Sequence, residues 1–86
     1  QDFMPIAGGA EIFEVTVDAG APIDGRSLID ADRDGLLPEE TIIVAIVRDD
    51  DLVIPQGETE IRADDVVTIF ARNGATNRVT DAFTGS

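Results

Sequence analysis

The chain has 86 residues, with 18 Asp and Glu against six Arg and no Lys, which gives a formal net charge of −12. It contains no His and no Cys, which excludes Ser-His-Asp triads, disulfides and thiolate metal sites, and its negative field disfavours nucleic acid and anionic membranes as partners. A domain of this size buries a thin core, so we expect it to be a homodimer.

The predicted elements begin after a short linker. Residues Gln1 to Ala10 end in Ala7-Gly8-Gly9-Ala10, a run typical of flexible connections, so we predict a linker over 1–10 and one domain over 11–86. The alternation in Glu11 to Val17 predicts a half-buried strand. Ser27 is expected to cap a short helix through Ala31, which Gly35 ends.

The middle of the chain predicts a β-hairpin. The segment from Thr41 to Val47 has no charge, which indicates a central strand covered on both faces. Arg48 and Asp49 to Asp51 form a charged turn, and Leu52 to Pro55 returns as a short strand that the proline ends.

The last part of the chain predicts one more strand and one more helix. Val66 to Ala71 is strongly apolar, Asn73-Gly74 breaks this strand, and Ala75 to Phe83 has the spacing of an amphipathic helix. The expected fold is therefore a small α/β (α+β) sandwich of short strands with a β-hairpin and two short helices.

The order of these pieces resembles the TrkA C-terminal (RCK-C) domain family from about Glu11 to Gly85. The pattern opens with the strand Glu11 to Val17. The segments that follow are Ala21-Pro22-Ile23-Asp24-Gly25-Arg26-Ser27-Leu28, Ile43-Val44-Ala45-Ile46-Val47-Arg48-Asp49-Asp50, Leu52-Val53-Ile54-Pro55-Gln56-Gly57-Glu58-Thr59 and Ile61-Arg62-Ala63-Asp64-Asp65-Val66-Val67-Thr68-Ile69-Phe70-Ala71. Asp64 stands where the family commonly has Gly, and Asp enters left-handed conformations at modest cost. The lack of Lys with Arg retained resembles proteins of salt-accumulating archaea.

The resemblance implies a regulatory domain that has no enzymatic activity and needs no cofactor. Such a domain forms a homodimer, is cytoplasmic and associates with the membrane through a potassium channel or cation transporter. It binds a small effector, in some members cyclic di-AMP, in the cleft between two copies, and it gates the transporter. The alternative from another class is a purely structural dimerisation domain of a transporter subunit.

The resemblance places candidate ligand-binding residues at one end of the hairpin. These are Ile43, Ala45, Ile46, Arg48, Ile54 and Pro55. Apolar walls would hold the purine rings and Arg48 would meet a phosphate. The alternative for the aliphatic residues is plain core, and for Arg48 it is pairing with Asp49 to Asp51. Because Arg48 precedes a solvated turn, we expect its replacement by Ala to cost the fold little.

A second candidate motif is acidic. Asp30, Asp32, Asp34 and Gly35 match the opening of an EF-hand calcium loop, but Thr41 occupies the position of the bidentate Glu. A solvated acidic loop is the main interpretation, with weak Ca²⁺ binding as the alternative. The sequence has no GxGxxG, GxxxxGK[ST] or GxSxG motif, so we expect no catalysis.

Overall fold

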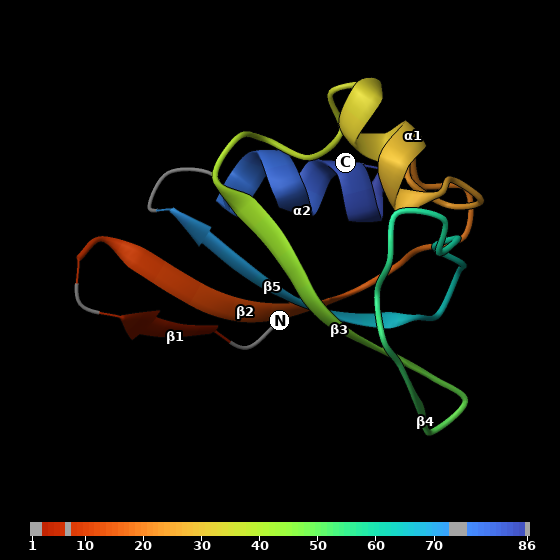
Figure 1. Ribbon diagram of the computed structural model, residues 1–86, viewed down its shortest axis with the longest axis horizontal. Coiled ribbons are helices and arrows are strands. Elements are labelled where there is room, and N and C mark those ends of the chain that lie inside the picture. The colour runs from red at the N-terminus through yellow and green to blue at the C-terminus, as the bar shows by residue number, and fades with distance from the viewer. Residues whose placement is uncertain (1–2, 7, 73–75, 86) are drawn as a thin grey trace.

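The computed structural model describes residues 3–6, 8–72 and 76–85. The elements in chain order are β1 (Phe3–Ile6), β2 (Ala10–Thr16), α1 (Leu28–Arg33), β3 (Thr41–Arg48), β4 (Asp51–Val53), β5 (Val66–Arg72) and α2 (Thr76–Thr84). The strands form one antiparallel sheet in the order β1-β2-β5-β3-β4. Both helices lie on the same side of this sheet (Figure 1). The predicted small α+β fold with a hairpin and two short helices is confirmed.

The N-terminal segment differs from the predicted linker. Strand β1 pairs antiparallel with the start of β2, in a register that places Phe3 opposite Phe13 and Ile6 opposite Ala10. Gly8 and Gly9 have φ angles of 92° and 81°, which glycine adopts without steric cost, and this allows the chain to turn tightly. The glycines that indicated a flexible run therefore form a hairpin turn, and the linker prediction was wrong for β1.

The first helix follows its sequence signals. The Oγ of Ser27 accepts a hydrogen bond from the backbone N of Asp30 at 3.1 Å, which is the predicted N-cap. The helix ends at its C-cap Asp34, and Gly35 follows with a φ of 76°. Backbone hydrogen bonds join Leu28 N to Thr59 O at 3.0 Å, so the helix start is tied to the segment between β4 and β5.

The two faces of the sheet differ in their cover. On the helix side, β5 and its neighbours contribute fully buried side chains to the core, including Val67, Ile69 and Ile46. On the other side of β3, Ile42 and Val44 are 58% and 49% exposed. The prediction that this strand is central and covered on both faces was therefore wrong, because both helices pack on one face and β5 lies at the centre.

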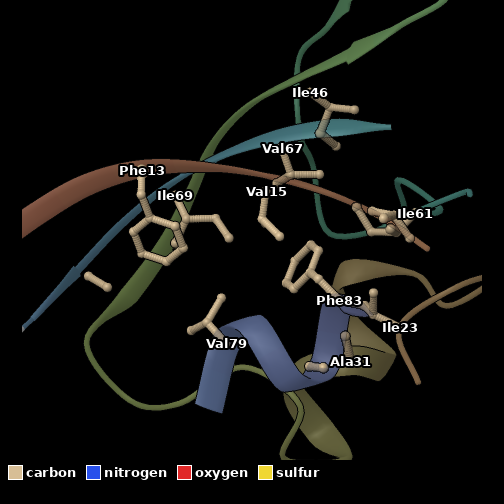
Figure 2. Close-up of a cluster of buried hydrophobic side chains, with 13 residues drawn as sticks. Phe13, Val15, Ile23, Ala31, Ile46, Ile61, Val67, Ile69, Val79 and Phe83 are labelled. Carbon is tan, nitrogen blue, oxygen red and sulfur yellow. The ribbon is translucent and has the colours of Figure 1, made fainter. Parts of the chain in front are cut away.

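The second helix closes the core from the same side. Val79 and Phe83 are fully buried and Ala82 nearly so, as the helical spacing predicted. Figure 2 shows Phe83 pointing from α2 toward the sheet, near Val15 and Ile23. Ala75, expected to begin this helix, and the Asn73-Gly74 break lie outside the described residues.

The hairpin that presents the candidate site is shorter than predicted. Strand β4 pairs only with Ile46 to Arg48 of β3, so Ile54 and Pro55 follow the strand instead of extending it. Asp49 and Asp50 form the two-residue turn with φ angles of 51° and 67°, left-handed values that Asp tolerates better than most residues.

Candidate functional site

Arg48, at the end of β3, forms the most extensive side-chain interaction of the described chain. Its Nε donates to Oδ1 of Asp65 at 2.8 Å, and its Nη2 donates to Oδ2 of Asp65 at 2.8 Å. The same Nη2 also donates to the backbone O of Glu60 at 2.8 Å. This two-point geometry matches the guanidinium fork to the carboxylate and ties β3 to the segment before β5.

The pair is largely withdrawn from solvent. The Asp65 side chain is 1% exposed and that of Arg48 is 23% exposed. Burial by itself favours the neutral carboxyl, but hydrogen bonds from Arg48 and from the backbone N of Arg62 at 2.9 Å outweigh it, so the pKa of Asp65 lies below its ordinary value. The hydrogen bond that Arg48 donates to Asp65 raises the pKa of Arg48. Both groups are therefore charged.

A turn of the backbone places the Asp65 carboxylate under Arg48. The backbone N of Asp65 donates to Arg62 O at 3.1 Å, and Asp64 between them has a φ of 72°. The expectation that Asp64 replaces a family glycine in a left-handed conformation is confirmed. A cavity of about 160 Å³ lies beside the pair, lined by Arg48, Asp49, Arg62, Ala63, Asp64 and Asp65.

The sequence did not identify Asp65 as the partner of Arg48. The alternative of pairing with Asp49 to Asp51 named the wrong carboxylates, because the guanidinium points back toward β5 and not to the turn. Nothing in the local sequence distinguishes Asp64, which is exposed, from the buried Asp65. The expectation that loss of Arg48 costs the fold little assumed a solvated side chain, whereas Arg48 is 23% exposed and pairs with a buried carboxylate.

The structure separates the other candidate residues into core and surface. Ile46 is fully buried, and Ile43 packs against the core from the same side. Ala45 lies opposite Thr68 and is half-buried, Ile54 is 65% exposed, and Pro55 is half-buried. Ile46 is therefore a core residue, Ile54 is exposed, and Ile43, Ala45 and Pro55 are partly buried.

An apolar surface surrounds those exposed candidates. The large hydrophobic residues of β3, β4 and the following position that are at least a third exposed are Ile42, Val44, Val47, Leu52 and Ile54. Val47 lies opposite Leu52 across the hairpin, which makes them neighbours. We call these five residues the hairpin patch. Exposed apolar side chains that gather on one part of a small domain make that part a candidate interaction surface.

The EF-hand-like segment does not assemble a cation site. Asp30 pairs with Arg33 at 3.4 Å, and Asp34 forms an ion pair with Arg26, so cationic side chains already hold these two carboxylates. Within residues 3–6, 8–72 and 76–85, no group of three acidic side chains is close enough to hold a metal ion. Asp30, Asp32 and Asp34 lie on the short helix α1 or at its C-cap, not in a loop that surrounds a cation.

Comparison with known proteins identifies the fold family. The model of the TrkA-C domain matches residues 12–84, which contain most of the described elements other than β1. The chain belongs to the TrkA-C domain family. This confirms the family resemblance that the sequence segments carry, and it places β1 outside the matched part of the domain.

Curated relatives of this TrkA-C domain come from potassium uptake systems. It is 38% identical over 74 residues to "Trk system potassium uptake protein TrkA homolog 2" of Methanosarcina mazei, covering 86% of this chain and 16% of that protein. It is 34% identical over 65 residues to "Trk system potassium uptake protein TrkA homolog" of Archaeoglobus fulgidus, covering 76% and 14%. The chain spans about a sixth of the length of these relatives.

A solved structure shares the fold of this TrkA-C domain. The structure described as "Structure of RCK domain with cda" superposes with a TM-score of 0.66 and 16% sequence identity, covering 84% of this chain and 96% of that one. This likeness concerns the fold alone. Neither helix of the described chain is both long and apolar enough to cross a membrane.

Proposed function

We propose that this TrkA-C domain is the regulatory, effector-binding part of a potassium uptake system and has no enzymatic activity of its own. The observation that carries the proposal is the family match over residues 12–84, together with relatives named as Trk potassium uptake proteins. In this proposal the domain lies in the cytoplasm and transmits the bound state of an effector to a membrane transporter subunit as a shift between two conformations.

The effector site is proposed to lie between two copies, at the hairpin patch. Ile54 supplies apolar surface there, the half-buried Ala45 lies next to Val44 of the patch, and two copies would together enclose a ligand that one flat surface leaves exposed. Cyclic di-AMP is the effector that the family resemblance implies. Nη1 of Arg48 makes no hydrogen bond within the described part of the chain, so this nitrogen remains available for a phosphate oxygen.

Thermal denaturation with a panel of ligands tests this function. Cyclic di-AMP, ATP, NADH, Ca²⁺ and K⁺ are added separately in high salt, and a ligand that binds only the folded state raises the melting temperature. We expect a shift with cyclic di-AMP. A shift with Ca²⁺ alone would favour the calcium-binding alternative, and no shift with any ligand would favour a purely structural dimerisation domain.

Two variants locate the binding surface. Ile54→Glu places a negative charge in the hairpin patch, where it would repel an anionic effector, and it should abolish the shift. Asn77→Glu adds the same charge at an exposed position of α2 and should leave the shift unchanged. Equal shifts in both variants would contradict a site at the hairpin patch.

The acidic composition leads to a separate proposal, that the domain works at high salt. Acidic side chains repel one another in the folded state, and this repulsion is screened when the Debye length falls to about 3 Å near 1 M salt. With a net charge of −12, we expect the melting temperature to rise steadily from dilute buffer to molar KCl. Melting curves over a KCl series measure this, and a flat or falling trend would contradict the adaptation to salt.

A further inference from the structure

A cavity on the helix side of the sheet shares no lining residue with the hairpin patch or with the Arg48–Asp65 pair. It has a volume of about 310 Å³ and lies between the C-terminal half of α2 and the loop that joins α1 to β3 (Figure 1). Pro22, Leu36 and Pro38 give it apolar walls. A cavity of this size, with apolar walls and a few polar groups, is typical of a small-molecule site.

Backbone hydrogen bonds hold the walls of this cavity in place. Ile23 N donates to Ala82 O at 3.1 Å, which ties the segment that contains Pro22 to the last turns of α2. On the other side, Leu36 N donates to Ala31 O at 2.9 Å, and the Leu36 side chain packs against the core. The walls are therefore formed before a ligand binds, which reduces the conformational entropy lost on binding.

Two side chains of opposite charge line the same cavity. Arg78 and Asp81 are three residues apart on α2, so the guanidinium and the carboxylate lie on one side of the helix. Within the described part of the chain neither side chain forms an ion pair, whereas each of the other five arginines pairs with a carboxylate. In a chain with 18 acidic residues and six Arg, an arginine without a carboxylate needs a reason.

We propose that this cavity binds the zwitterion of a free α-amino acid with an apolar side chain. Arg78 pairs with the carboxylate of the ligand, and Asp81 accepts hydrogen bonds from its ammonium group. The side chain of the ligand lies against Pro22, Leu36 and Pro38 and is removed from water there. This site is separate from the effector site proposed at the hairpin patch and does not rest on it.

The charge of the chain favours a zwitterion over other ligands. A net charge of −12 repels an anion, and a nucleotide at this cavity would also face the carboxylate of Asp81. A simple cation would be attracted to Asp81 but would leave Arg78 without a partner. A zwitterion has no net charge and satisfies both side chains. In a free α-amino acid a single carbon separates the two charged groups, which suits two side chains on adjacent turns of a helix.

Calorimetric titration in molar KCl with L-leucine and L-phenylalanine tests the site. Analogues that lack one charged group separate the two contacts. Isocaproate and hydrocinnamate are the corresponding acids without the amine, and isoamylamine and phenethylamine are the corresponding amines without the carboxylate. We expect at least one of the amino acids to bind saturably. Loss of either charged group should weaken its binding at least about tenfold, because each removes a charge-assisted hydrogen bond.

Variants of the two charged residues assign each contact. Arg78→Ala and Asp81→Asn should each weaken binding of the amino acid at least about tenfold. Arg78→Ala should also bind the amino acid no more tightly than the amine, and Asp81→Asn should bind it no more tightly than the acid, because the contact that distinguishes the ligands is gone. Asn77→Ala changes an exposed residue of α2 that does not line the cavity and should leave the affinity unchanged.

The outcomes decide the proposal without reference to the hairpin patch. It is overturned if neither amino acid binds at millimolar concentration, if the single-charge analogues bind as tightly as the amino acid, or if Asn77→Ala weakens binding as much as Arg78→Ala. Arg78→Ala should leave the thermal shift with cyclic di-AMP unchanged, since Arg78 lies outside the hairpin patch. Failure of either site therefore leaves the other proposal standing.

Discussion

Replacement of Arg48 by Ala should lower the free energy of unfolding by about 2 to 4 kcal/mol, because it leaves the Asp65 carboxylate buried without its cation. The side chain of Asp65 is 1% exposed, so water cannot replace the two hydrogen bonds that Arg48 donates to it. We place the effect somewhat below that of a fully buried pair because Arg48 is 23% exposed. Chemical denaturation in molar KCl measures it.

Arg62→Ala is the matched control for this prediction. Arg62 belongs to the same turn, but its side chain is 60% exposed and contacts Glu60 at 3.4 Å, while its bond to Asp65 comes from the backbone N, which the substitution retains. We expect a change within about 0.5 kcal/mol. If Arg62→Ala and Arg48→Ala lower the free energy of unfolding by the same amount, the hydrogen-bonded Arg48–Asp65 pair makes no specific contribution to stability.

The pH dependence gives the same interaction a second readout. The pKa of Asp65 is lower in the folded state than its ordinary value, so the ionised carboxylate stabilises the folded state. This contribution to the free energy of unfolding is fully present above the unfolded pKa of Asp65, and it is lost as the pH falls through the folded pKa. Asp65→Asn removes this titration. The difference in stability between the original chain and Asp65→Asn should therefore be largest at neutral pH and shrink below about pH 4.

The sequence predicted those parts of the fold that depend on local chemistry. Ser27 as a helix cap and the buried positions of α2 follow from rules that act over a few residues. The left-handed conformation of Asp64 followed from the family resemblance, in which Gly is common at this position. The charged turn was predicted over Arg48 to Asp51, and the structure confines it to Asp49 and Asp50 because Arg48 and Asp51 pair with each other in the hairpin.

What the sequence could not predict depends on contacts between distant segments. Seven uncharged residues in β3 indicate burial, but whether both faces are covered depends on which side the helices pack, and that is decided by the topology of the sheet. The partner of Arg48 is 17 residues away in the sequence and is one of two adjacent aspartates. Strand β1 forms by pairing with β2, and the glycine-rich segment between them does not by itself specify that pairing.

The Arg48–Asp65 pair also anchors the hairpin to a distant segment of the chain. Arg48 lies opposite Asp51 at the hairpin turn, and through Asp65 and the backbone O of Glu60 it fixes this end of β3 to the chain that enters β5.

Phe83→Ala should have the largest effect of any single truncation on α2, a loss of about 3 to 5 kcal/mol in the free energy of unfolding. Phe83 is fully buried and is one of the largest side chains of the core, pointing from the last turn of α2 toward the sheet (Figure 2). Its backbone O also accepts a hydrogen bond from Asp18 N at 2.9 Å, which the substitution preserves, so the loss reports the ring alone.

Arg78→Ala provides the matched control on the same helix. Arg78 is exposed, and the structure gives its side chain no ion pair within the described residues, so its loss should change stability by less than about 0.5 kcal/mol. A cost for Phe83→Ala as small as that of Arg78→Ala would mean that α2 is not docked on the sheet in solution. In that case the helix face of the sheet would be open to solvent, and the core that Val79 and Phe83 complete would be lost.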